Sequence, residues 1–162
     1  MMTSGKSGMP AVAVVLPLVW ATAGAANAVG FIMGGPPSAV GMIATLVAAC
    51  AWPAAGWYAA SQSRTGFIRL ATVFWITVVA GAPLALWALT SAEGMTVSQG
   101  EIVLPAILFA LAAPLYGLAG ALPSWEPAVQ TMLVGLVVFA LTVLAYVARQ
   151  RIGRRSARTS PV

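Results

Sequence analysis

The sequence predicts an all-α integral membrane protein, a bundle of about five transmembrane helices with a basic C-terminal tail. Of its 162 residues, 60% are hydrophobic and only 7% are charged, whereas a soluble domain carries about 25% charged residues. The mean hydropathy is +0.94. The apolar residues form long uninterrupted stretches, and nearly all of the charges lie between or after them.

Five stretches are long enough to cross a bilayer, because about 20 helical residues rising 1.5 Å each cover a hydrocarbon layer of roughly 30 Å. None of them contains Asp, Glu, Lys, Arg or His. We therefore expect one transmembrane domain over residues 1–148 in the plasma (inner) membrane, crossing it several times. The expected spans are 11–33, 37–60, 70–89, 102–122 and 129–148.

The first apolar stretch has a second interpretation. Lys6 precedes it, and Ala26-Asn27-Ala28 fits the small-x-small pattern at which a signal peptide is cleaved. However, the apolar residues continue through Met33, further than a signal-peptide core usually extends. We expect residues 11–33 to be retained as the first helix.

Positive charges near the ends of the spans set orientation. With five spans and a cytoplasmic C-terminus, five tail arginines lie inside, whereas Lys6, Arg64 and Arg69 lie outside. All eight would lie inside if 102–122 re-entered the membrane without crossing it, but lipid-facing backbone outside a helix leaves polar groups unpaired. We therefore expect an outward N-terminus. The tail, 149–162, is expected to be disordered and to bind anionic lipid headgroups through Arg149, Arg151, Arg154, Arg155 and Arg158.

Proline and tryptophan indicate where a ligand cavity would form. Four of the five predicted helices contain proline, and a proline inside a helix removes a backbone hydrogen bond and can kink the helix. A kinked helix leaves a crevice and a free carbonyl that a deep indole N–H can use. Asn27 is the amide placed deepest in a span and is expected to hydrogen-bond another helix. The candidate cavity residues are Trp20, Asn27, Trp52, Pro53, Trp75, Pro83 and Pro114.

Small residues recur three or four positions apart in the first and fourth stretches. Such spacing lets helix backbones approach closely, which drives helix association in lipid. The expected packing residues are Gly24, Ala28, Gly30, Gly34, Ala113, Gly117 and Ala121.

Few residues could support catalysis. The chain has no histidine and a single cysteine, Cys50, and its only acids are Glu93, Glu101 and Glu126, all outside the spans. No nucleophile–base pair, metal cluster or phosphate-binding loop can be assembled from these residues. We expect no enzyme activity, no cofactor and no metal. Because the basic tail directly follows a span, it indicates contact with lipid rather than with nucleic acid.

Two functions remain open. The first is a non-catalytic interaction protein: an accessory subunit of a membrane complex, or a helix bundle that associates with itself. The alternative is a carrier or binding protein for an uncharged or lipophilic small molecule. The expected partners are the lipid bilayer and either another membrane protein or a second copy of this chain.

Overall fold

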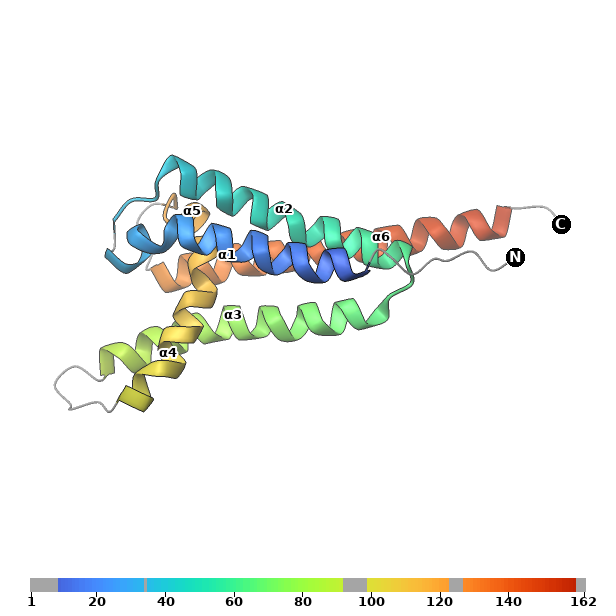
Figure 1. The fold of residues 1–162 in the computed structure, drawn as a ribbon. Coiled ribbons are helices and arrows are strands. Elements are labelled where there is room, and N and C mark those ends of the chain that lie inside the picture. The colour runs from blue at the N-terminus through green and yellow to red at the C-terminus, as the bar shows by residue number, and fades with distance from the viewer. Residues whose placement is uncertain (1–8, 34, 92–98, 123–126, 160–162) are drawn as a thin grey trace.

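The computed structural model describes residues 9–33, 35–91, 99–122 and 127–159, and every element in these ranges is helical (Figure 1). Within these described ranges, three helices are long and apolar enough to cross a membrane, at Val12–Met33, Ala39–Ser61 and Val129–Arg155. The elements are α1 (Met9–Met33), α2 (Ala39–Ser61), α3 (Thr65–Ser91), α4 (Gln99–Ala112), the 3-10 helix η1 (Ala113–Leu115), α5 (Tyr116–Ala119) and α6 (Pro127–Thr159).

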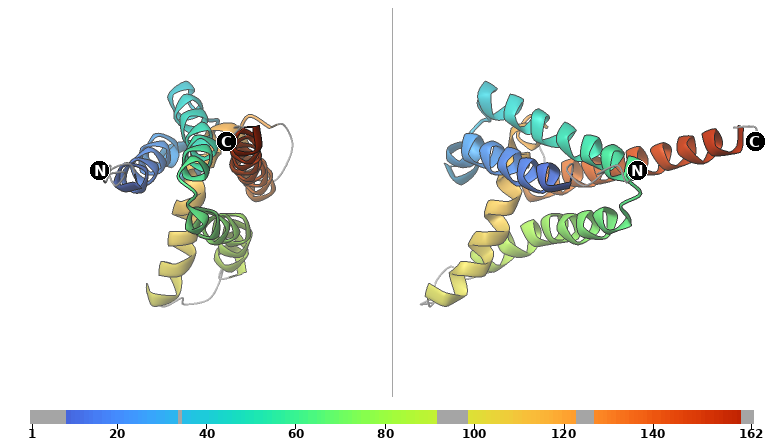
Figure 2. Two further views of the ribbon diagram at one scale, coloured as in Figure 1. Left: turned by 90° about the vertical axis from the view of Figure 1, so that its right-hand side faces the viewer. Right: turned by 45° about the vertical axis from the view of Figure 1, so that its right-hand side comes forward.

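Four long helices run back and forth along one axis. Viewed end-on, α1, α2 and α6 form a row with α2 in the middle, and α3 lies on one side of this row (Figure 2, left). The start of α1 and the end of α6 lie at the same end of the bundle, together with the turn between α2 and α3 (Figure 1). The opposite end holds the connection between α1 and α2 and the start of α6.

Local sequence explains how α2 begins and ends. Ser38 is its N-cap, and the Ser38 hydroxyl accepts a hydrogen bond of 3.0 Å from the Gly41 N–H, which satisfies one of the free donors at a helix N-terminus. After Ser61 the chain reverses in three residues, with Ser63 at a positive φ of 54°. The Arg64 N–H closes this turn on the Ala59 carbonyl at 2.9 Å.

The last helix, α6, continues beyond residue 148 as far as Thr159. Residues 149–159 are therefore helical, whereas the sequence predicted a disordered tail over 149–162. Alanine and arginine favour helix, and basic residues near a helix C-terminus interact favourably with its dipole. The same helix packs tightly on α2: a Cβ at Gly56 would lie 2.9 Å from the Thr142 carbonyl oxygen. The Tyr146 hydroxyl donates to the Arg64 carbonyl at 3.4 Å, which ties α6 to the α2–α3 turn.

The fourth apolar stretch is not the continuous helix expected over 102–122. It forms α4, a 3-10 turn and the four-residue α5. In Figures 1 and 2, α4 runs across the direction of the long helices, from near the end of α3 towards the row of α1, α2 and α6. The Tyr116 hydroxyl then donates to the Gly35 carbonyl in the α1–α2 connection. The segment therefore starts and finishes at the same end of the bundle.

Proline explains the break, and burial explains why the break is tolerated. Pro114 lies in the 3-10 turn and has no N–H to continue an α-helix. The backbone around it is enclosed by protein: Ala112 and Leu115 are fully buried. The Leu111 carbonyl accepts a hydrogen bond from Trp20, and the Pro114 carbonyl accepts one from Thr45. Non-helical backbone at membrane depth is stable when protein groups satisfy it in this way.

The arginines gather at one end of the molecule. That end holds the α2–α3 turn, the first turns of α3 and the last part of α6 (Figure 1). Lys6, outside the described residues, precedes by three positions the start of α1, which is also at this end. The described arginines of the basic end are Arg64, Arg69, Arg149, Arg151, Arg154 and Arg155.

Candidate functional site: an apolar groove along α1

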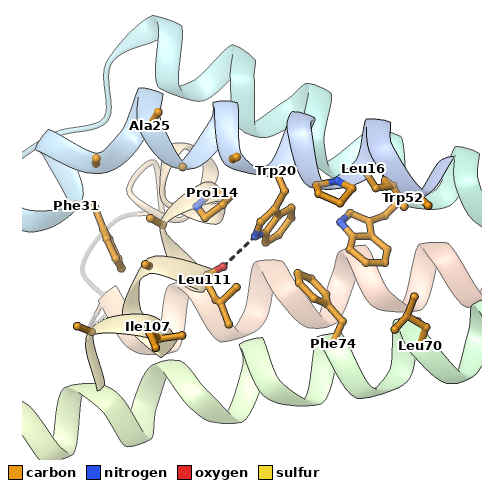
Figure 3. Close-up of a pocket in the computed structure, with 18 of the residues that line it drawn as sticks. Leu16, Trp20, Ala25, Phe31, Trp52, Leu70, Phe74, Ile107, Leu111 and Pro114 are labelled. Carbon is orange, nitrogen blue, oxygen red and sulfur yellow. Dashed lines mark hydrogen bonds between the residues drawn. The ribbon is translucent and has the colours of Figure 1, made fainter. Parts of the chain in front are cut away.

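A cavity of about 1050 Å³ lies between α1 on one side and α3 and α4 on the other (Figure 3). We call it the groove. Residues of α1 line it from Val12 to Ile32, which is nearly the whole helix. Phe67, Leu70 and Phe74 of α3 form the facing wall in the half nearer the basic end.

The other half of the facing wall comes from the broken fourth segment. Ile107 and Leu111 of α4 and Pro114 of η1 line it, and Figure 3 shows them opposite Phe31 and Ala25 of α1. Because α4 crosses the bundle instead of running along it, it fills only this half. The break at Pro114 therefore allows the fourth segment to form this half of the wall that faces α1.

The lining is almost wholly apolar. It consists of glycine, alanine, valine, leucine, isoleucine, proline, phenylalanine and tryptophan, and none of the lining residues carries a charge or a side-chain oxygen. The only polar side-chain groups among them are the indole N–H groups of Trp20 and Trp52. Such a surface accepts hydrocarbon and offers little to a polar ligand.

Four aromatic residues pack together at the middle and inner side of the groove, and we call them the aromatic cluster: Trp20 of α1, Trp52 of α2, and Phe74 and Trp75 of α3. The rings of Trp52 and Phe74 are stacked, with centroids 4.7 Å apart. Trp20 stands at nearly right angles to Trp52, Phe74 and Trp75, at centroid distances of 6.2, 5.3 and 5.6 Å. Edge-to-face pairs of this kind are favourable contacts, and here they join three helices.

The three indole N–H groups of the cluster differ in their partners. That of Trp20 donates to the Leu111 carbonyl at 3.2 Å (Figure 3). Leu111 is in the last turn of α4, where carbonyls have no partner within the helix. The N–H groups of Trp52 and Trp75 are buried and have no hydrogen-bond acceptor among the described residues.

A second buried group, which we call the polar node, joins α1, α2 and η1. The amide of Asn27, only 2% exposed, donates to the Thr45 hydroxyl at 2.9 Å and to the Gly41 carbonyl at 3.3 Å. Thr45 contacts its own helix at the Gly41 carbonyl and reaches the Pro114 carbonyl at 2.7 Å. In a bilayer such interhelical bonds hold helices in register.

Glycine makes the close approach at the node possible. A Cβ at Gly117 of α5 would overlap the Gly41 carbonyl oxygen and the Thr45 hydroxyl. A Cβ at Gly41 would overlap the Asn27 side-chain oxygen, which has no hydrogen-bond donor among the described residues. The backbones of α2 and α5 therefore meet here without an intervening side chain.

The structure divides the candidate cavity residues. Trp20, Trp52 and Pro114 line the groove, and Trp75 packs behind them in the aromatic cluster. Asn27 belongs to the polar node instead, and Pro53 and Pro83 are not in the groove wall. Phe74, Leu111 and Thr45 were not predicted as site residues from the sequence. Of these, only Thr45 gave a signal, as a hydroxyl in mid-span.

The candidate packing residues also lie in different surroundings. A Cβ at Gly24 would lie 3.4 Å from the Pro114 ring, and one at Gly30 would lie 3.3 Å from the Tyr116 ring. Ala113 and Gly117 are buried, whereas Ala28 lines the groove. Ala121 is exposed beyond the end of α5, because the break at Pro114 removes the helical spacing that placed it on this stripe. Gly34 lies outside the described residues.

Of the tail arginines, Arg149 lies over the Trp57 ring, with its guanidinium carbon 5.8 Å from the ring centroid. This cation–π contact lies at the basic end. Arg151, Arg154 and Arg155 are exposed on α6. Arg158 is in the last turn of the helix, and its side chain lies outside the described residues.

No known protein family, curated protein or solved structure matches this chain. The groove, the aromatic cluster and the polar node therefore carry the functional interpretation.

Proposed function

We propose that this chain is a multi-pass membrane protein that binds or carries an uncharged or lipophilic molecule in the groove. The observation that carries the proposal is a cavity of about 1050 Å³ whose lining residues include no charged side chain. Ligand pockets commonly measure about 300–1,000 Å³ and are lined mostly by apolar and aromatic residues. This function was the alternative interpretation of the sequence, and the groove makes it the better supported one.

A ligand dissolved in the bilayer would enter from the side. Burial in the groove exchanges lipid contacts for protein contacts, so the hydrophobic effect contributes little, and selectivity depends on shape and packing. The flat faces of Trp20, Trp52 and Phe74 provide rigid surfaces for such packing. The ligand class that fits is therefore an apolar molecule with enough length or area to contact these rings.

Quenching of tryptophan fluorescence tests the proposal. In a variant with Trp57, Trp87 and Trp125 changed to Phe, only the tryptophans of the aromatic cluster remain. A spin-labelled alkane in detergent should quench this protein with saturation. In the same background, Ala25→Phe fills the groove, since Ala25 is an exposed lining residue, and should weaken the quenching at least tenfold.

The control is Ala140→Phe, which adds the same ring to an exposed position of α6 outside the groove. It should leave the quenching curve unchanged. Linear, unsaturable quenching that is identical in both variants would show that the alkane dissolves in the detergent and does not occupy the groove.

A second candidate function rests on the small residues of the groove. Ala21, Gly24, Ala25 and Ala28 of α1 all line it, and such a stripe is typical of surfaces that receive another helix. The occupant would then be a helix of a partner subunit or of a second copy of the chain. In that case Ala25→Phe would break up a complex, and sedimentation in detergent would show a smaller particle for this variant than for Ala140→Phe.

We also propose an orientation. The gathering of the described arginines at the basic end supports a cytoplasmic location for that end. In this proposal α3, which is 27 residues long, crosses the membrane in addition to the three helices described above as long and apolar enough to do so. Four crossings place both termini inside, whereas the sequence predicted five crossings and an outward N-terminus. Reporter fusions after Ser61 and Val162 should both be cytoplasmic, and fusions after Pro37 and Leu122 should both be outside. A cytoplasmic reporter after Pro37 together with an external reporter after Ser61 would restore the five-span arrangement, because the two arrangements differ at these positions.

A further inference from the structure

We infer that the groove takes an extended hydrocarbon chain with an anionic headgroup, and that the headgroup lies at the basic end beside Arg64 and Arg69. This inference rests on the proposed function and specifies its ligand. It follows from the length of the groove, the difference between its two ends and the position of the aromatic cluster.

The groove is as long as a membrane is thick. Its α1 wall runs from Val12 to Ile32, and 20 steps of 1.5 Å give about 30 Å, the thickness of the hydrocarbon core. The same helix lines it without interruption, on positions three and four apart. A compact ring system would occupy only part of this length, whereas an extended chain would contact the wall throughout.

The two ends of the groove differ in charge. At the basic end the wall includes Phe67 and Leu70. Arg64 lies three residues before Phe67, Arg69 directly precedes Leu70, and both arginines are exposed. At the other end, lined by Phe31 and Ile32, the described residues include no lysine or arginine.

This difference in charge favours one orientation of an anionic amphiphile bound along the groove. A chain with an anionic headgroup gains electrostatic attraction when the headgroup lies at the basic end. In the reverse direction the headgroup would meet no arginine or lysine of the described residues. An uncharged chain would have no such preference, because the lining residues carry no charge.

The aromatic cluster then contacts the middle of the chain. Trp20 is eight residues from Val12 along α1, which places it about 12 Å from the basic end of the groove. In Figure 3, Trp20 projects from α1 between the part of the groove at Phe31 and the part at Leu70. A probe on the middle of the chain would therefore lie near Trp20, and a probe beside the headgroup would not.

The test uses the variant that retains only the tryptophans of the cluster. Three spin-labelled probes are compared: an alkyl phosphate with one chain, phosphatidylglycerol with two, and the uncharged alcohol of the same chain length. The label is placed either at mid-chain or next to the headgroup. We expect the phosphate probes to bind at least tenfold more tightly than the alcohol, with stronger quenching from the mid-chain label. Whichever of the two phosphate probes binds more tightly identifies the source of the chain.

Two matched variants locate the headgroup. Arg64→Gln with Arg69→Gln should remove most of the preference for phosphate over alcohol, about tenfold. Arg154→Gln with Arg155→Gln removes the same charge from exposed positions of α6 and should retain the preference. Near-ultraviolet circular dichroism checks that both variants keep the aromatic packing.

The results separate the inference from the proposed function. Equal binding of the phosphate and the alcohol, or an equal loss of preference in both arginine variants, would overturn the inference while leaving a groove that binds lipophilic molecules. If no probe quenches with saturation, the proposed function fails as well.

Discussion

Gly117→Ala tests the close approach of α5 to α2. The added Cβ would overlap the Gly41 carbonyl oxygen and the Thr45 hydroxyl. The carbonyl belongs to the backbone of α2 and cannot rotate away, so α2 and α5 must separate. Their separation would also stretch the 2.7 Å hydrogen bond from Thr45 to the Pro114 carbonyl.

The size of the effect can be estimated from these contacts. Overpacking costs about 1–3 kcal/mol, and the loss of one hydrogen bond costs about 0.5–1.5 kcal/mol. Replacing glycine by alanine in a helix stabilises the helix by up to about 1 kcal/mol, which offsets part of this loss. We therefore expect Gly117→Ala to lower the free energy of unfolding by about 0.5–4.5 kcal/mol, with a central value of about 2.5 kcal/mol.

Two other glycines serve as controls. A Cβ at Gly135 would lie 3.1 Å from a Val79 methyl group and 3.4 Å from Leu115 and Trp75 side chains, so Gly135→Ala should cost less than about 1 kcal/mol because side chains can shift. A Cβ at Gly153 would have nothing within 4 Å, and Gly153→Ala should be neutral or slightly stabilising.

The assay is reversible unfolding of the purified protein in mixed micelles with increasing sodium dodecyl sulfate, followed by tryptophan fluorescence. Gly117→Ala should unfold at clearly lower detergent fraction than the other two variants. If the three midpoints coincide, α5 does not pack on α2 as described, and the polar node cannot hold the fourth segment in place.

Three further predictions concern single interactions. Thr45→Val keeps the side-chain shape but removes the bonds to Asn27 and the Pro114 carbonyl, and should cost about 1–2 kcal/mol in the same unfolding assay; an unchanged midpoint would show that the node adds no stability. Trp20→Phe keeps an aromatic ring but leaves the Leu111 carbonyl without its donor. Hydrogen exchange of the backbone amides around Pro114 should therefore accelerate by about tenfold. Equal exchange rates in the variant and the original protein would contradict a stabilising role for this hydrogen bond. Replacing the arginines of the tail by glutamine should weaken binding to anionic liposomes and leave the bundle folded, because each contributes about 1 kcal/mol at such a surface; unchanged binding would leave the tail no role at the lipid surface. The residues to be changed are Arg151, Arg154, Arg155 and Arg158.

The helices themselves could be predicted because each depends on its own segment. Apolar length without ionisable residues is visible in the sequence, and the predicted spans 11–33, 37–60 and 129–148 each lie largely within a helix of the structure. The break at Pro114 was harder to predict. Proline gave a warning, but the segment remains uniformly apolar, and what stabilises its non-helical backbone comes from Trp20 and Thr45, which are 91 and 69 residues away from their acceptors.

The candidate site, like the fold, could be predicted from the sequence only in part. Deep tryptophans indicated an aromatic site, and two of the three candidates line the groove. Phe74 and Leu111 carry no signal of their own, since an apolar residue in a membrane helix is unremarkable until its neighbours are known. The orientation of α4 decided their role, and that orientation depends on contacts between helices.

Pro114 takes part in two regions of the protein at once. Its ring lines the groove and faces Gly24, while its carbonyl accepts the hydrogen bond of Thr45 in the polar node. Because the pyrrolidine ring is rigid, ring and backbone move together. Any occupant that displaces the ring also displaces the carbonyl that accepts the hydrogen bond from Thr45. Binding in the groove is therefore mechanically coupled, through this one residue, to the hydrogen bond between α2 and the fourth segment.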